Sequence, residues 1–171
     1  MRNFLLLASA LATLAAATAP PAGADTTATF TLTAGALSIS APTGTVPLGA
    51  SQVASTSSHT FSGPLGTVTV TDERGGATAW VASVISTAFT PNNAAAAVPA
   101  INVGYAAGTI TVSALVVAVK PATTDLTGVS PVVNGTSTGI STASWNPTIT
   151  VVAPAGAAPG IYSGTITHSV A

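Results

Sequence analysis

A period of two between apolar residues constrains the fold of this chain more than any other feature. Thr67–Thr71 and Thr109–Ser113 place β-branched apolar side chains at every second position, with hydroxyl side chains between them. This spacing is typical of a β-strand with one buried face, whereas an amphipathic helix needs apolar residues three or four positions apart. The rest of the chain is rich in Thr, Ser, Val, Gly and Pro and shows no helical period. The pattern therefore predicts an all-β protein.

Clusters of Gly, Pro and Asn, such as Gly75-Gly76 and Pro91–Asn93, separate the apolar segments and predict turns. Asp125–Ser137 is long and poor in strand-forming residues, which predicts a loop, and Ala94–Pro99 is expected to form one helical turn. Short strands without helices between them predict an antiparallel Greek-key, immunoglobulin-like β-sandwich. The predicted strands are Thr26–Thr33, Ala36–Ala41, Leu65–Thr71, Trp80–Phe89, Ile101–Ala106, Thr109–Lys120, Ser144–Val152 and Ile161–Val170.

The first 24 residues have the pattern of a secretory signal peptide. Met1–Asn3 carries one positive charge, Phe4–Ala17 is apolar, and Ala22–Ala24 fits an A-x-A cleavage site. The apolar stretch is shorter than the roughly 20 residues of a membrane span, although an N-terminal membrane anchor is the alternative interpretation. We therefore expect residues 1–24 to be removed and residues 25–171 to form one exported domain. No later segment predicts a membrane span, so we expect the protein to be released or held non-covalently.

Charged residues are rare: the 171 residues include three Lys and Arg, four Asp and Glu, and no cysteine. So few cations cannot neutralise a run of phosphates, which excludes nucleic acid as a partner. Without cysteine the chain can form no disulfide, no thiolate metal site and no cysteine nucleophile. Its edge strands would also lack the lysines that block edge-to-edge pairing. Such a surface suits a protein that is fixed in a wall or an assembly.

The few titratable residues do not predict an active site. Asp72 and Glu73 are adjacent, so on an extended strand they would face opposite sides and not form a catalytic pair. His59 and His168 are the only histidines, and neither lies in a metal-binding motif. We therefore expect no enzymatic activity, no metal and no cofactor.

The segment Val70–Trp80 gathers three of the few charges ahead of a tryptophan. Asp72 and Arg74 would project to the same side of an extended strand, within reach of a charge-assisted pair. Gly75-Gly76 would allow a hairpin turn that returns Trp80 to a place beside the preceding strand. The structural interpretation is a pinned hairpin with a core tryptophan. The alternative is that Asp72, Arg74 or Trp80 contacts a ligand directly.

This Asp-x-Arg-Gly turn followed by Trp resembles the WxL domain family of Gram-positive surface proteins. The first Trp motif is Trp80–Ala82, with Ala where the family has Leu, and the second candidate is Trp145–Pro147. The Pro-rich turn that ends at Pro159 and the strand Gly160–Thr167 are also similar to the end of that domain. The resemblance implies export, non-covalent attachment to the cell wall with peptidoglycan as the ligand, and a binding role for Asp72, Arg74, Trp80 and Trp145.

The leading functional prediction is a secreted WxL-like β-sandwich at the cell surface, without catalytic activity. Its expected partners are a cell-wall polymer or other surface proteins, and neither nucleic acid nor, after signal cleavage, a membrane. Recognition would rely on hydroxyl and amide hydrogen bonds and on exposed aromatic residues, because no basic patch is present. The alternative prediction is a self-assembling subunit of a surface fibre or coat, since unguarded edge strands favour β-augmentation.

Overall fold

The computed structural model describes residues 23, 24 and 26–171, with the backbone alone for residues 114–116. It divides into a segment that ends at Leu32 and a compact domain, Thr33–Ala171. The predicted signal peptide lies almost wholly outside the described residues. Residues 26–32 are exposed and form no strand, so the predicted strand Thr26–Thr33 is wrong for this structure.

The domain is built from antiparallel strands, which confirms the all-β prediction. Its described residues contain no α-helix and no helix long and apolar enough to cross a bilayer. One short 3-10 helix, η1 (Ala100–Asn102), precedes the sixth strand. The strands are β1 (Leu37–Ser40), β2 (His59–Pro64), β3 (Val68–Asp72), β4 (Thr78–Ser86), β5 (Thr90–Pro91), β6 (Val103–Ala106), β7 (Ile110–Val119), β8 (Ser130–Trp145), β9 (Thr148–Ala153), β10 (Tyr162–Ser163) and β11 (Ile166–Val170).

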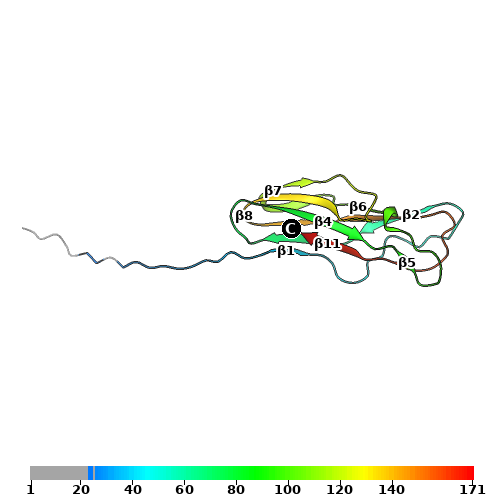
Figure 1. Ribbon diagram of the computed structural model, residues 1–171, viewed down its shortest axis with the longest axis horizontal. Coiled ribbons are helices and arrows are strands. Elements are labelled where there is room, and N and C mark those ends of the chain that lie inside the picture. Colours follow the sequence, from blue (N-terminus) through cyan, green and yellow to red (C-terminus); the bar gives the residue numbers. More distant parts are fainter. Residues whose placement is uncertain (1–22, 25) are drawn as a thin grey trace, which may run out of the picture. The chain divides into compact units, whose positions relative to one another are not determined.

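Strand β8 is the long central strand of the main sheet and has partners along both edges (Figure 1). Ala143 of β8 pairs with Val70 of β3 and with Val112 of β7. Because a strand has two hydrogen-bonding edges, β3 and β7 lie on opposite sides of β8. Gly135 of β8 likewise lies between β4 and β7. Strands β3 and β4 therefore follow one another along the same edge of β8, opposite β7.

A second sheet, in the order β2-β9-β6, continues the rows of the main sheet. Strand β8 leads into β9 through Asn146 and Pro147, and β2 leads into β3 on the neighbouring row. The amide of Leu65 donates to the carbonyl of Pro147 (2.8 Å), and the amide of Gly66 donates to Asn146 Oδ1 (2.9 Å). These bonds hold the two rows together at the junction between the sheets.

Strands β1 and β11 complete the main sheet, which curves until it is nearly closed. Strand β1 pairs with β3, and β11 pairs with β4, so the two lie on the same side of β8. The resulting sheet is closer to a barrel than to one flat layer of a sandwich. The observed architecture is thus antiparallel, as predicted, with more curvature than the predicted immunoglobulin-like sandwich has.

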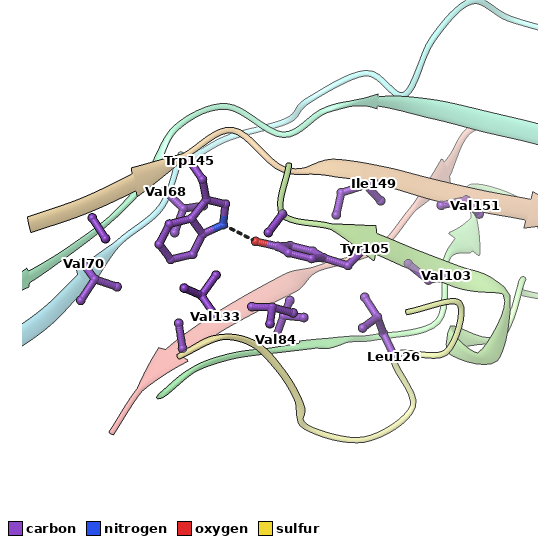
Figure 2. Packing of buried hydrophobic residues seen from close by; sticks show 14 of the residues in the cluster. Val68, Val70, Val84, Val103, Tyr105, Leu126, Val133, Trp145, Ile149 and Val151 are labelled. Carbon is purple, nitrogen blue, oxygen red and sulfur yellow. Dashed lines mark hydrogen bonds between the residues drawn. The ribbon is translucent and has the colours of Figure 1, made fainter. Parts of the chain in front are cut away.

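One hydrophobic core fills the space enclosed by both sheets (Figure 2). Alternate residues of each strand point into it, as the period of two requires. Val68 and Val70 come from β3, Tyr105 comes from β6, and Ile149 and Val151 come from β9. Because residues of both sheets share this core, the domain folds as one unit.

Several predictions about individual segments were wrong. The predicted loop Asp125–Ser137 contains the first half of β8, in which Val133, Gly135 and Ser137 are buried in alternation. Strand β2 was not predicted, because its sequence HTFSGP combines weak strand formers with a terminal proline. The predicted helical turn at Ala94–Pro99 is absent, and η1 begins one residue after it.

Candidate functional site

The segment from Asp72 to Trp80 is not the hairpin that its glycines suggested. Strands β3 and β4 both pair with β8 and not with each other, so the chain continues in the same direction after the turn. Gly75 and Gly76 both adopt positive φ angles (73° and 74°), which only glycine adopts readily. Residues 73–77 thus separate from β8 as a short loop opposite its residues 138–140, while Glu73 keeps its backbone hydrogen bonds to Gly35 and Ala36.

Asp72 ends β3 and is completely buried at this interruption. Its carboxylate accepts three hydrogen bonds from Arg74: from the amide (3.1 Å), from Nε (2.9 Å) and from Nη2 (3.0 Å). The Arg74 side chain remains 33% exposed, and its Nη2 also donates to the carbonyl of Ala79 (3.1 Å). The predicted Asp72–Arg74 pair is therefore present, and it ties both ends of the loop together.

Three hydroxyl residues complete the surroundings of Asp72. Thr78 Oγ1 donates to Asp72 Oδ2 over 2.8 Å, and Ser137 Oγ donates to the same oxygen over 2.9 Å. Ser137 Oγ also lies 2.8 Å from Ser141 Oγ. Because the Ser137 proton is used on the carboxylate, the Ser141 hydroxyl donates to Ser137. The network links β3, β4 and both sides of the irregularity in β8.

These contacts fix the charge of Asp72. The Arg74 guanidinium holds the pKa of the Asp72 carboxyl well below its ordinary value, against the opposing effect of burial, and the hydroxyls of Thr78 and Ser137 lower it further. A carboxylate that stays ionised and fully hydrogen-bonded is a poor general acid or base at neutral pH. The arrangement instead fixes the path of the backbone.

Trp80, two positions into β4, is buried in the core. Its ring lies against Gly135 of β8, where the Cβ atom of any other residue would overlap the indole. The indole Nε1 is buried and has no hydrogen-bond partner. Gly135 is thus required by the ring packed on it, and Trp80 acts through its volume.

Trp145, at the other end of β8, is equally buried but makes polar contacts. Its Nε1 donates to the hydroxyl oxygen of Tyr105 over 2.8 Å (Figure 2). The same hydroxyl lies 3.1 Å from Nε2 of His168, and the two rings meet edge to face with centroids 5.6 Å apart. The Tyr105 hydroxyl thus accepts from the indole and shares a second hydrogen bond with His168 Nε2.

The chain of side chains from Trp145 to His168 is uncharged. Burial raises the pKa of Tyr105 to about 12, with the Trp145 hydrogen bond acting in the opposite direction. Burial also lowers the pKa of His168, so its imidazole is neutral at neutral pH. The buried Nδ1 of His168 has no hydrogen-bond partner. This chain connects β8, β6 and β11 across the core.

Two adjoining cavities lie beside the loop of residues 41–48. One of about 390 Å³ is lined by His168 among others, and one of about 420 Å³ lies over Phe61 and Val151. Leu48 and Tyr162 line both. The larger cavity is bordered mainly by apolar side chains. A cavity of this size with a few polar groups at its edge is the usual form of a small-ligand site.

The structure places the four predicted site residues in two separate groups. Asp72, Arg74 and Trp80 lie together at the interruption between β3 and β4, whereas Trp145 lies at the far end of β8. Both indoles are inside the core, and only Arg74 reaches the surface. The residues that complete these groups were not predicted, because Thr and Ser are abundant and because Tyr105 and His168 lie far from Trp145 in the sequence. The missed residues are Thr78, Ser137 and Ser141 around Asp72, and Tyr105 and His168 beyond Trp145.

Metal coordination has no support in the described part of the chain. No group of three or more His, Asp or Glu residues lies close enough there to hold an ion. His59 is bound instead by Gln52 Oε1 (2.8 Å) and Ser55 Oγ (2.9 Å). In the comparisons with known proteins, no family, no curated protein and no solved structure matches this chain.

Proposed function

We propose that this chain is an exported cell-surface protein whose WxL-like domain associates non-covalently with the cell wall, through peptidoglycan or a neighbouring surface protein. The observation that supports this proposal is the unit formed by the family-like motif. Asp72, Arg74 and Trp80 share one interruption of the sheet, where the ion pair fixes the loop and the indole fills the core behind it. The motif thus has a structural role at this interruption of the sheet.

The finer fold belongs to the same proposal. We regard the domain as a strongly curved variant of the immunoglobulin-like sandwich, with β2, β9 and β6 as its second layer. In support, residues of this small sheet and of the main sheet pack into one core. The Greek-key character rests on β8, which returns after a long connection to lie between β7 and the earlier pair β3 and β4.

A wall-binding role needs a surface that recognises an uncharged polymer. Both tryptophans are buried, so the aromatic contact would come from a residue at a cavity. Tyr162 lines both cavities and is only partly buried, with its hydroxyl donating to the carbonyl of Ala158 (2.9 Å). We place the contact with the wall at this residue.

Sedimentation of the exported protein with purified cell walls tests the proposal. We expect wild-type protein to pellet with the walls, and Tyr162→Ala to weaken the affinity about fivefold or more, the effect of losing roughly 1 kcal/mol of contact. Ile101→Ala, an exposed apolar residue that lines neither cavity, is the matched control and should bind as wild type. Wild-type protein that stays in the supernatant contradicts wall binding, and unchanged binding by a folded Tyr162→Ala contradicts the site.

We further propose that the domain has no catalytic activity. The best-placed carboxylate, Asp72, is locked by its donors, and Glu73 beside it faces solvent. Incubation with cell-wall substrates should therefore give no glycosidase or peptidase turnover above buffer. A reproducible turnover that Asp72→Ala removes from a still-folded protein would contradict this.

A further inference from the structure

Strand β7 forms a free edge of the main sheet. It pairs with β8 along its whole length, and no other strand of the described chain pairs with its outer edge. Its ten residues, Ile110–Val119, include no charge and no proline. Natural proteins usually protect such an edge with lysine, proline or a bulge, because its unpaired backbone groups can bind another strand. The register irregularity between Ser113 and Leu115 lies within β7, and the residues on both sides of it pair with β8.

The inward face of β7 is incompletely covered. Val112 pairs with Ala143 of β8, and Val119 pairs with Val133, so both valines point to the side of the sheet that carries the core. Ala143 and Val133 are fully buried, yet Val112 remains 41% exposed and Val119 46% exposed. The apolar layer therefore stops at β7, at the position where one more strand would bury it.

The segment Thr26–Thr33 has the sequence of a strand but pairs with no strand of the described residues. Threonines alternate with Ala28, Phe30 and Leu32, the period of two that predicted a strand. Phe30 is 91% exposed and Leu32 is 87% exposed. Eight extended residues span about 26 Å, which fits along the roughly 33 Å of a ten-residue strand such as β7.

We propose that residues 26–33 of one copy add as a strand to the free edge of β7 in a second copy. Phe30 and Leu32, about 7 Å apart along such a strand, then cover the exposed part of Val112, and the threonines face outward beside Thr111. Main-chain hydrogen bonds provide the affinity and the alternating side chains set the register, as in other cases of strand addition. This inference concerns self-association and is independent of wall binding.

Chain connectivity favours a second copy over the chain's own β7. The Gly35 amide is bound to the Glu73 carbonyl (2.8 Å), which fixes this point in the row of β1. A strand added beyond β7 would lie four strand spacings from β1, which is about 19 Å measured along the sheet. Three residue steps from Gly35 back to Leu32 span only about 10 Å. Because the donor segment and β7 are different surfaces of each copy, the contact repeats head to tail and builds an open chain or a ring.

Sedimentation velocity of the purified exported protein over a range of concentrations tests the proposal. We expect the wild-type sedimentation coefficient to increase with concentration. The donor variant Phe30→Ser/Leu32→Ser and the edge variant Val112→Lys/Val119→Lys should each remain monomeric. Val53→Ser (88% exposed) is the control for the donor variant, and Val152→Lys on the doubly paired strand β9 is the control for the edge variant. Both controls should associate as wild type does.

Mixing the two variants gives the decisive result. The donor variant keeps a normal β7, and the edge variant keeps a normal segment, so their equimolar mixture should form a one-to-one dimer and nothing longer. A wild-type protein that is monomeric at all concentrations, a donor variant that associates like wild type, or a mixture of folded variants without a dimer overturns the proposal. The donor variant alters only exposed side chains outside any strand, so it remains a valid test even if the edge variant unfolds.

Discussion

The two tryptophans of this domain are equally buried but have different surroundings. Trp80 packs against Gly135 and leaves its indole nitrogen without a partner, whereas Trp145 donates to Tyr105, which in turn contacts His168. Near Trp80, the polar groups are those of the Asp72 cluster, and they fix the loop that precedes β4. Near Trp145, the polar groups are the indole nitrogen itself, the Tyr105 hydroxyl and the His168 ring, which are hydrogen-bonded to one another across the core.

This difference shows how one residue type stabilises a β domain in two ways. Near Trp80, the Asp72–Arg74 ion pair stabilises the end of β3, and the indole contributes apolar contacts. At Trp145 an uncharged chain of hydrogen bonds orients three rings from three strands. The two bonds of this chain favour one arrangement of the three rings, because turning Trp145 or Tyr105 away would break a buried hydrogen bond.

The largest expected effect comes from removing the ring that acts through volume. Trp80→Ala should lower the free energy of unfolding by about 3–5 kcal/mol, as truncation of a large buried aromatic does. Wall binding should then fall only as far as the folded fraction falls. Urea unfolding and wall sedimentation on the same sample measure both. An unchanged unfolding midpoint together with lost wall binding would contradict the structural role and favour direct contact with a ligand.

Removing the buried charge near Trp80 should have the next largest effect. Asp72→Ala leaves the hydroxyls of Thr78 and Ser137 and the Arg74 side chain without their acceptor. We expect a loss of about 3 kcal/mol, the lower end for a broken buried ion pair, because Arg74 is partly exposed. Glu73→Ala, a change to the exposed neighbouring carboxylate, is the control and should keep the wild-type midpoint in urea. Equal effects of the two changes would show that the cluster does not stabilise the fold.

A smaller change separates the two indoles directly. Trp145→Phe removes the hydrogen bond to Tyr105, whereas Trp80→Phe removes no hydrogen bond. The first variant should therefore be less stable than the second by about 1–3 kcal/mol, the cost of leaving a buried polar group unsatisfied. Chemical denaturation of both variants at neutral pH provides the comparison. Equal losses would mean that the Trp145–Tyr105 bond contributes nothing net.

The smallest effects are those of pH, and they differ between the two regions. The pKa of His168 is lowered from 6.5, so the unfolded chain takes up a proton first and stability falls as the pH drops below 6.5. The pKa of Tyr105 is raised from 10.0 to about 12, so stability falls as the pH rises above 10. The pKa of Asp72 is lowered from 3.8, so this residue reduces stability only when the pH falls below 3.8. Each group contributes at most about 1.4 kcal/mol per pH unit.

Urea midpoints at pH 5, 8 and 11 measure these limits. Tyr105→Phe should be less stable than wild type at pH 8 and lose less stability than wild type between pH 8 and pH 11. An alkaline loss of the same size in Tyr105→Phe would assign that loss to other groups.

The sequence predicted the strands whose side chains alternate cleanly. Thr109–Lys120 located β7 to within one residue at each end, because β-branched residues occupy most of its positions. The sequence pattern did not reveal that Ser130–Trp145 is one strand, because Pro131, Gly135 and Gly139 weaken the local strand signal. Pairing along both edges stabilises β8 in spite of its composition. Such partners lie far away in sequence, so local patterns do not report them.

The candidate site was predictable where its chemistry is local. Asp72 and Arg74 are two residues apart on an extended chain, and their pairing followed from that spacing alone. The hairpin prediction failed because Gly75 and Gly76 allow positive φ in a loop as readily as in a turn. Ser137, 65 residues from Asp72, joins the cluster only because β3 and β8 pair. Distant members of this kind become visible only once the register is known.

The position of the central strand in the chain has a consequence for how the protein acquires its structure. Strands β2, β3 and β4 each pair with residues 130–153, far from their own positions in sequence, and only β3 has a partner made before it, β1. During synthesis β2 and β4 therefore have no strand to pair with until most of the chain has been made. Folding dominated by such distant contacts is slow, on the order of milliseconds to seconds. The domain therefore completes its central sheet only after residues 130–153 have joined the earlier strands.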